Sequence, residues 1–156
     1  MEKTISTRGD FYTFDNGEKP PLQFSQTEYD SRLKGLLKIM SDKGLEAVVL
    51  TSMHCVSYYT GFTYCSFGRP YACVVTHDRA FTISAGIDGG MPARRSATEN
   101  IIYSDWKRDN VWRAVKSYLG NAKALGIERD HLTIIQQSKI GLHSVIENEP
   151  IIRYVG

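Results

Sequence analysis

The sequence lacks the features that mark membrane or secreted proteins. No run of 18 apolar residues occurs among its 156 residues, so no segment is long enough to cross a bilayer as a helix. Residues Met1–Asp10 hold no continuous apolar stretch of the kind that forms a secretory signal. The only cysteines are Cys55, Cys65 and Cys73, and no two of them form a CxxC pair. We therefore expect reduced thiols and a cytoplasmic protein.

A strong excess of charge of one sign is also missing. The 19 Lys and Arg residues outnumber the 17 Asp and Glu residues by only two, which gives a net charge of +2. A protein that binds nucleic acid or an anionic membrane usually shows a larger or more clustered basic excess. The hydrophobic fraction of 42% and the charged fraction of 23% are those of an ordinary globular domain. We expect one domain, with neither nucleic acid nor membrane as a partner.

Motifs for catalysis and metal binding are scarce. His54, His77, His131 and His143 show no H-x-x-x-H or H-E-x-x-H spacing, so a histidine metal site is not expected. The sequence contains no G-x-S-x-G elbow and no P-loop. Cys65 has no histidine at a recognised spacing, and we predict it to be a small buried hydrophobic residue. These patterns predict a chain without a self-contained catalytic centre.

The patterns that are present indicate alternating helices and strands. Ser25 and Glu28 are spaced as a capping box before apolar residues at helical spacing, and Gly44 ends the predicted helix. About four helices are expected in all, and Asp109 is predicted to cap one of them. Residues 132–146 are predicted to be mostly helical. Residues 51–59 are ambiguous and compatible with a short helix capped by Thr51 or Ser52, and Pro92 is compatible with the first turn of another. The predicted strands are Ala47–Leu50, Tyr71–Val75, Ala80–Ala85, Ile101–Tyr103, Ala124–Ile127 and Ile151–Val155.

These elements predict a three-layer α/β domain with a mixed six-stranded sheet. Alternation of strands and helices requires crossover connections and hence some parallel pairing, whereas a tight turn at His77 and Asp78 makes one antiparallel hairpin. Residues 1–24 carry two turn signals, Asn16-Gly17 and Pro20-Pro21, and are predicted to form an extended arm. Residues 25–156 are predicted to form the domain itself.

The most distinctive stretch runs from Tyr58 to Tyr71. It contains six of the chain's 17 aromatic residues, two glycines, a proline and one cation, Arg69, but no acidic residue. Aromatic walls beside one guanidinium suit a small, flat, anionic ligand, because the rings supply apolar area and the guanidinium binds a carboxylate through two hydrogen bonds. A strand that enters an aromatic core, with Arg69 on the surface, also accounts for this composition, and most aromatic clusters are core. Both interpretations stay open at this level.

This stretch resembles the amino-terminal domain of creatinases (creatine amidinohydrolases), which belong to the creatinase/prolidase, or pita-bread, family. The run Tyr64–Tyr71 is the most specific part, and the resemblance extends over roughly residues 25–155 in the same order. The other segments that carry it are Thr51-Ser52, His54, Tyr58-Tyr59, Ile83-Ser84-Ala85, Ile87-Asp88-Gly89-Gly90, Pro92, Arg94-Arg95, Asn100-Ile101, Tyr103, Asp105-Trp106, Arg108-Asp109-Asn110, Gly126-Ile127-Glu128 and Asp130-His131-Leu132.

The resemblance implies a ribonuclease-H-like mixed sheet and a two-domain enzyme. In that family a larger pita-bread domain follows and carries the catalytic groups, and this sequence ends at Gly156, about where that domain would begin. We therefore expect a domain that is inactive alone, taken from an enzyme that hydrolyses creatine to sarcosine and urea. The creatinase resemblance implies no cofactor, whereas prolidases bind two metal ions in the domain that is missing here.

The resemblance also implies a binding site that two subunits share. In creatinase dimers the amino-terminal domain of one subunit reaches over the active site of the other, where an aromatic ring and an arginine contact the substrate. Phe67 and Arg69 occupy those positions, and the family's arginine binds the substrate carboxylate. We therefore expect a homodimer in which Phe67 and Arg69 bind a small molecule with a carboxylate and an amidino group.

Some residues depart from the family pattern and leave alternatives open. Met91 and Ala93 stand where creatinases have glutamine and tryptophan, and Thr60-Gly61 and Thr63 also differ. Another amidino compound or small N-substituted amino acid is compatible with these differences. The alternatives are the amino-terminal domain of a metal-dependent Xaa-Pro dipeptidase or aminopeptidase, and a stand-alone dimerisation or binding module.

Overall fold

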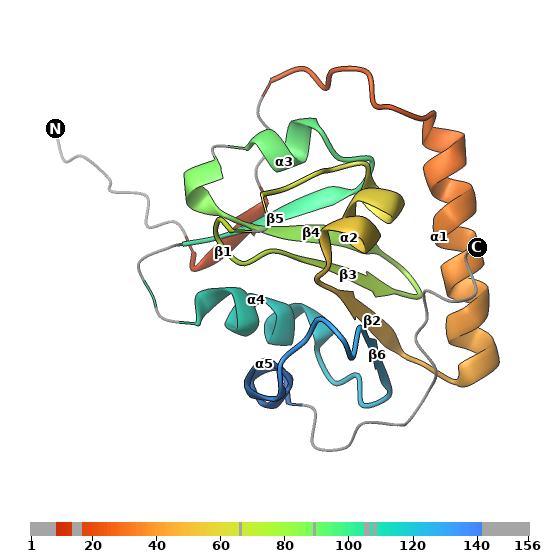
Figure 1. Cartoon of the computed structure of the whole chain (residues 1–156), viewed down its shortest axis with the longest axis vertical. Coiled ribbons are helices and arrows are strands. Elements are labelled where there is room, and N and C mark those ends of the chain that lie inside the picture. Colours follow the sequence, from red (N-terminus) through yellow and green to blue (C-terminus); the bar gives the residue numbers. More distant parts are fainter. Residues whose placement is uncertain are drawn as a thin grey trace, which may run out of the picture.

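A computed structural model describes residues 9–13, 17–65, 67–88, 90–104, 107 and 109–141, and its elements alternate along the chain (Figure 1). The strands are β1 (Phe11–Thr13), β2 (Ala47–Leu50), β3 (Ala72–Thr76), β4 (Ala80–Ala85), β5 (Glu99–Tyr103) and β6 (Leu125–Ile127). The helices are α1 (Gln26–Lys43), α2 (Met53–Thr60), α3 (Met91–Arg94), α4 (Asn110–Leu119) and α5 (Ile134–Lys139), with one 3₁₀ turn, η1 (Gly86–Asp88).

The six strands form one mixed sheet in the order β1-β5-β4-β3-β2-β6. β4 pairs with β5, and β2 with β6, in parallel, while the other neighbours are antiparallel. The hairpin of β3 and β4 closes over His77 and Asp78, where the Thr76 amide donates to the Arg79 carbonyl at 2.8 Å. The predicted fold class and hairpin are therefore confirmed.

The membership of the sheet differs from the prediction at one strand. Phe11–Thr13 lies within the stretch predicted to be an extended arm, yet it pairs with β5 as an edge strand, with Phe11 opposite Tyr103. The predicted strand Ile151–Val155 lies outside the described residues. A three-residue strand has no periodicity of its own, so its pairing depends on the β5 edge that the remainder of the fold provides.

Local signals at α1 account for its two ends. The Glu28 amide donates to the Ser25 hydroxyl at 3.2 Å, which satisfies one of the free amides of the first turn. The Glu28 side chain pairs with Arg32 instead of returning to the Ser25 amide, so only half of the predicted capping box forms. At the other end Gly44 adopts a left-handed conformation with φ of 65°, as a glycine cap does.

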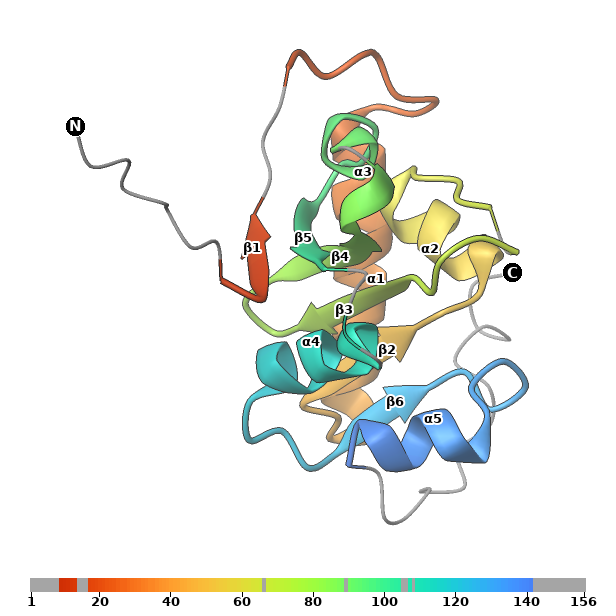
Figure 2. The same ribbon diagram turned by 90° about the vertical axis from the view of Figure 1, so that its left-hand side faces the viewer.

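Two hydrophobic cores lie on opposite faces of the sheet, which gives the three layers (Figures 1 and 2). One face of β2 and β3 packs under α1 and α2, and the other face packs against α4 and against Leu132 and Ile140, which flank α5. Strand residues alternate between these faces, so Val48 and Cys73 belong to one core while Val49 and Val74 belong to the other. Figure 2 shows α1 and α4 on either side of the strands.

The last described helix is shorter than predicted. α5 begins with a full capping box between Thr133 and Gln136 and runs over Ile134–Lys139, whereas the predicted helix covered 132–146. Residues 142–156 lie outside the described part of the chain. Within the described residues, no helix combines the length and the apolar character needed to span a membrane.

Candidate functional site

Several loops meet at one edge of the sheet. The parallel pairs place the ends of β2 and β6 together, and likewise those of β4 and β5. The antiparallel partner β3 begins at this same edge, because Ala72 lies opposite Ile83. In sheets with parallel strands, ligands usually bind outside the strands' carboxyl ends. The loop 61–71, which contains both predicted site residues, enters β3 at this edge.

Most of the aromatic run packs into the core. Tyr59, Phe62 and Tyr71 are buried. The Tyr71 ring stacks on Tyr64 with centroids 4.7 Å apart and on Phe62 with centroids 5.4 Å apart. The rings of Phe62, Tyr64 and Tyr71 therefore fill the base of the loop, and for them the core interpretation of the sequence is the right one.

The tip of the loop points outward. Phe67 is 93% exposed, the largest value among the exposed hydrophobic residues described, and Arg69 is exposed as well. Between them, the Gly68 amide donates to the Cys65 carbonyl at 3.0 Å and closes a turn. A Cβ atom at position 68 would lie 3.2 Å from that carbonyl oxygen, so the turn suits glycine. The two predicted site residues thus stand together at an exposed tip.

Two tyrosines fasten the backbone behind this tip. The Tyr103 hydroxyl, at the end of β5, donates to the Pro70 carbonyl at 2.7 Å. The Tyr64 hydroxyl donates to the Thr51 carbonyl. The loop is therefore anchored to two different strand ends while Phe67 and Arg69 stay accessible.

A recess of about 210 Å³ lies beside Arg69, and Pro70, Tyr103, Lys107 and the first turn of α4 line it. Lys107 Nζ lies 2.7 and 2.8 Å from the two carboxylate oxygens of Asp10. The ion pair and hydrogen bond with Lys107 hold the pKa of Asp10 below its usual value. The lysine in this recess is thus already paired with a carboxylate.

Asp109 occupies the N-cap of α4, as predicted, but its side chain does not cap the helix. Asp109 has a left-handed backbone with φ of 59°, and its side chain makes no capping hydrogen bond. Its carboxylate accepts from Lys139 Nζ of α5 at 2.7 Å. The ion pair with Lys139 explains why the Asp109 side chain does not cap the helix. Lys139 lies 30 residues away, so the local sequence pattern does not indicate this pair.

A buried carboxylate that the sequence patterns did not single out anchors the start of α2. Glu128, only 3% exposed, accepts from the Thr51 amide at 2.5 Å and from the Ser52 amide at 2.8 Å. It also accepts from the Ser52 hydroxyl, which in turn caps α2 at the Cys55 amide. A negative charge at a helix amino terminus is favourable, since the helix dipole is positive there. Glu128 therefore ties β6 to the helix that leads into the loop.

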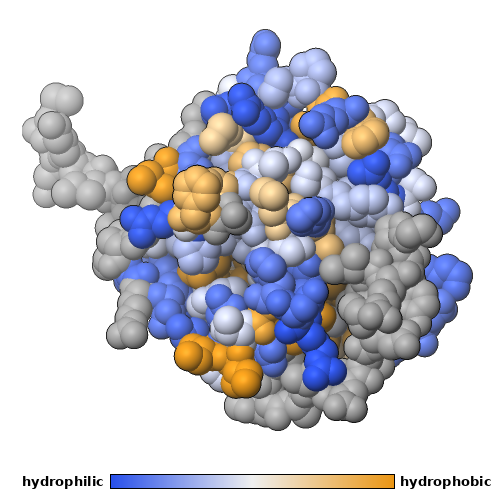
Figure 3. Space-filling model, viewed as in Figure 1, coloured by the Kyte–Doolittle hydropathy of each residue, from blue (hydrophilic) through white to orange (hydrophobic). Residues whose placement is uncertain are grey.

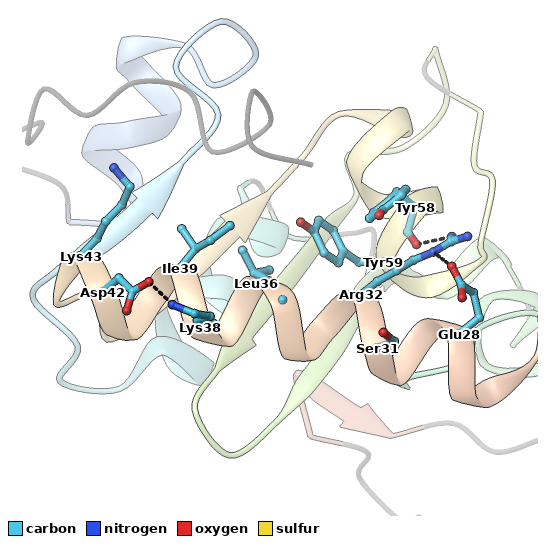
Figure 4. A pocket seen from close by; sticks show the side chains of 11 residues that line it. Glu28, Ser31, Arg32, Leu36, Lys38, Ile39, Asp42, Lys43, Tyr58 and Tyr59 are labelled. Atoms are coloured by element: carbon cyan, nitrogen blue, oxygen red, sulfur yellow. Dashed lines mark hydrogen bonds and ion pairs between the residues drawn. The ribbon is translucent and has the colours of Figure 1, made fainter. Parts of the chain in front are cut away.

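A second hollow, of about 650 Å³, lies between α1 and α2 (Figure 4). The Arg32 guanidinium lies 4.4 Å from the ring centroids of both Phe24 and Tyr58. It also donates to the Tyr58 carbonyl at 2.9 Å and to Glu28 at 3.0 Å. Through these contacts Arg32 joins α2 to the residues before α1, so we interpret its role as structural.

The histidines and cysteines that the structure describes form no metal site. Among the described residues, no group of three or more His, Cys, Asp and Glu side chains is placed to hold a metal ion. His77 contacts the Leu45 carbonyl at 2.9 Å, His131 contacts the Thr51 hydroxyl at 3.0 Å, and His143 lies outside the described residues. Cys65 is exposed, so its prediction as a buried residue is wrong: the chain leaves the core at Tyr64 and turns outward.

The exposed hydrophobic residues described on one face of the molecule form only small spots (Figure 3). The face in Figure 3 is mostly hydrophilic, with small hydrophobic spots. One spot lies over α5, where Ile134 and Ile135 are 84% and 67% exposed.

Comparison with known proteins places the chain in a family. Residues 32–149 match the model of the Creatinase/Prolidase N-terminal domain. The chain belongs to this family. It is 48% identical over 122 residues to a creatinase from Bacillus sp. (strain B-0618), and the match covers 76% of the chain but only 30% of that relative. The chain therefore spans less than a third of the length of this creatinase.

Solved structures support the same fold. The Creatinase/Prolidase N-terminal domain of an X-Pro dipeptidase from Streptococcus pyogenes superposes with a TM-score of 0.65 at 21% identity, over 80% of this chain and 96% of that one. The prolidase from Pyrococcus furiosus gives a TM-score of 0.56 at 21% identity, over 70% of this chain and 31% of that one. At such identities the likeness concerns the fold alone. The predicted family and fold are thus confirmed.

Proposed function

We propose that this chain is the non-catalytic amino-terminal domain of a creatinase-like hydrolase. In its complete form the enzyme would convert creatine and water to sarcosine and urea in the cytoplasm, without a cofactor. The observation that carries this proposal is the exposed pair Phe67 and Arg69, on a loop anchored at its base, in a chain 48% identical to a creatinase.

The chemistry of the loop tip fits a small molecule with a carboxylate at one end and an amidino group at the other. A guanidinium presents parallel N–H donors that match the two oxygens of a carboxylate. The face of an aromatic ring attracts a flat cation such as a protonated amidine. In this proposal Arg69 binds the carboxylate and Phe67 covers the amidino group.

The site is completed by a partner subunit in a homodimer. The loop tip is exposed, and within the described residues no group of three or more His, Cys, Asp and Glu side chains could hold a metal ion. A tip of this kind can supply binding contacts while the groups that transfer protons come from elsewhere. We propose that the catalytic domain of the partner supplies them.

Urea release from creatine by the full-length protein tests the activity. We expect turnover that persists after dialysis against a chelator. Metal-dependent cleavage of Xaa-Pro dipeptides without urea release would favour the dipeptidase alternative. If the protein shows neither activity and the chain dimerises, the stand-alone module would be favoured.

Arg69→Ala in the full-length protein tests the binding role. Loss of a desolvated, charge-assisted contact should cost about 2–4 kcal/mol in kcat/KM. Arg95→Ala, at the exposed end of α3, is the matched control and should leave kcat/KM within twofold. Equal kinetics for the Arg69 and Arg95 variants would remove the role of Arg69.

A further inference from the structure

We propose that Tyr103 is a positioning residue for Arg69, a role that rests on the proposed function of that arginine. Its hydroxyl donates to the Pro70 carbonyl at 2.7 Å and thereby fixes the peptide next to the arginine. Tyr103 itself touches no substrate in this proposal. It sets the direction from which the Arg69 side chain leaves the edge of the sheet.

The tyrosine is a rigid support. Tyr103 is 4% exposed and belongs to the core between the sheet and α4. Its backbone lies in β5 between two neighbours, opposite Ala85 of β4 and Phe11 of β1. A buried ring in a strand paired on both sides has little freedom, so the position of its hydroxyl is well defined.

Proline transmits this constraint to the arginine. The ring of Pro70 locks its φ near −65°, and the peptide between Arg69 and Pro70 is planar. Once the Pro70 carbonyl is held, only the ψ angle of Pro70 separates the anchored atom from the Cα atom of Arg69. The ψ angle of Arg69 then directs its side chain, and the following proline restricts that angle to extended values. A proline next to the functional arginine thus lets the hydrogen bond from Tyr103 contribute to the orientation of that arginine.

The other anchors of the loop do not replace this contact. The stack of Tyr71 on Tyr64 and Phe62 holds the base of the loop in the core, and the Tyr64 hydroxyl holds the Thr51 carbonyl. Removal of the Tyr103 hydroxyl should therefore leave the loop folded while the peptide that carries Arg69 gains freedom. This separates a positioning role from a purely structural one.

The test is a double-mutant cycle on creatine turnover by the full-length protein, with Tyr103→Phe and Arg69→Ala. We expect Tyr103→Phe to raise KM three- to tenfold with kcat within twofold, because substrate binding is weakened while the catalytic groups are intact. In the Arg69→Ala background the same change should alter KM less than twofold. Tyr118→Phe, whose ring packs on Phe81, is the matched control and should leave both constants unchanged.

The outcomes separate the two proposals. If Arg69→Ala has no effect on KM, the proposed function fails, and the positioning role fails with it. If Arg69→Ala raises KM but Tyr103→Phe raises it equally in both backgrounds, only the positioning role is overturned. Unchanged KM in Tyr103→Phe alone also overturns that role.

Two further measurements guard against a folding defect. Hydrogen exchange of the amides at Phe67, Gly68 and Arg69 should be at least fivefold faster in Tyr103→Phe, with the amides of β5 unchanged. Pro70→Ala removes the φ lock at an exposed position and keeps the carbonyl that Tyr103 holds. Like Tyr103→Phe, this change should raise KM, and only when Arg69 is present. Exchange rates equal to wild type in Tyr103→Phe, together with an unchanged KM in Pro70→Ala, would contradict the proposal that Tyr103 positions Arg69 through Pro70.

Discussion

Two buried tyrosine hydroxyls at the base of the Phe67–Arg69 loop have opposite surroundings. Tyr103 Oη donates to a carbonyl, whereas Tyr71 Oη is buried without a hydrogen-bond partner among the described residues. Burial raises the pKa of Tyr71 well above its usual value, although the nearby Thr82 side chain lowers it. The Thr82 hydroxyl donates to the Glu99 carbonyl and accepts from the Asn100 amide. Its contact with Tyr71 Oη lacks the geometry of a hydrogen bond.

The unsatisfied hydroxyl leads to a prediction about stability. A buried polar group without a partner costs about 1–3 kcal/mol, so Tyr71→Phe should leave the free energy of unfolding unchanged or raise it by about 1 kcal/mol. Tyr103→Phe should lower it by about 1 kcal/mol, because a hydrogen bond is lost. Urea unfolding of both variants measures the difference, and a less stable Tyr71→Phe would show that its hydroxyl has a partner.

Two glycines, Gly61 at the end of α2 and Gly35 within α1, predict opposite effects of alanine. Gly61 has φ of +79°, and a Cβ there would lie 2.6 Å from the Tyr29 hydroxyl oxygen. Gly61→Ala should therefore destabilise by more than the roughly 1–2 kcal/mol that a left-handed backbone costs. Gly35 lies within α1, where an added Cβ would meet no atom within 4 Å, so Gly35→Ala should stabilise by about 0.5–1 kcal/mol. Thermal unfolding that ranked the two variants in the reverse order would contradict the packing around Gly61.

The three thiols should differ sharply in reactivity. Burial raises the pKa of Cys55 and of Cys73 to about 12, whereas Cys65 is exposed. Since the thiolate is the reactive form, a disulfide reagent at pH 8 should modify one thiol in the folded chain and three after unfolding. Cys65→Ser should abolish the fast reaction. A second fast thiol in the folded chain would contradict the burial of the other two.

At the scale of elements, β1 is held at its start by a pair of side chains as well as by its pairing with β5. Asp10 precedes β1 and contacts Lys107, which follows β5, and Arg113 of α4 approaches the same carboxylate at 3.4 Å. Both cations favour the ionised form of Asp10 and hold its pKa in the folded chain below the usual value of an aspartate. The pair therefore links the edge strand to the loop beside the recess.

This linkage gives a pH dependence with a definite sign. A carboxyl group with a lowered pKa in the folded state contributes stability above its unfolded pKa, and that contribution is lost as pH falls through the folded pKa. The free energy of unfolding should therefore decrease as the pH falls below about 4, and Asp10→Asn should make this decrease shallower. Asp42→Asn removes an i,i+4 pair whose side chains are 76% and 62% exposed, so it should change the profile less. Identical profiles for wild type and Asp10→Asn would contradict the linkage.

Elements with local signals were the ones that the sequence predicted well. α1 has its cap, its apolar spacing and its terminal glycine within one segment, and the hairpin of β3 and β4 has a tight turn between two apolar runs. β1 was missed because its partner β5 lies about 90 residues away and provides most of its stabilisation. Asp109 occupies its predicted cap position, but the sequence did not indicate that its side chain pairs with Lys139, which is remote in sequence.

The candidate site shows the same division. The motif around Arg69 identified both residues at the loop tip, because the family resemblance is carried by consecutive positions. The sequence did not indicate that Tyr103 supports the loop or that Glu128 anchors α2, because these contacts join residues 33 and 76 positions apart or more. Contacts of this range follow from the order of strands in the sheet, which the sequence predicted only as mixed.

At the scale of the molecule, the proposed function separates binding from chemistry in space. The described part of the chain offers an exposed aromatic ring and an arginine on a firm base, but no cluster of groups for a metal ion. The creatinase relative is more than three times as long as the matched segment, so most of its length lies outside that segment. We therefore place the chemistry of the proposed enzyme in a different domain, and the selectivity for a carboxylate in this one.

The selectivity of the full-length enzyme for a carboxylate tests this division most directly. We would compare kcat/KM for creatine with kcat/KM for an analogue whose carboxylate is replaced by a neutral hydroxymethyl group, in wild type and in Arg69→Ala. If Arg69 binds the carboxylate, wild type should prefer creatine by about 30-fold or more, as about 2 kcal/mol requires, and the variant should lose most of that preference. An equal preference in wild type and variant would contradict the account.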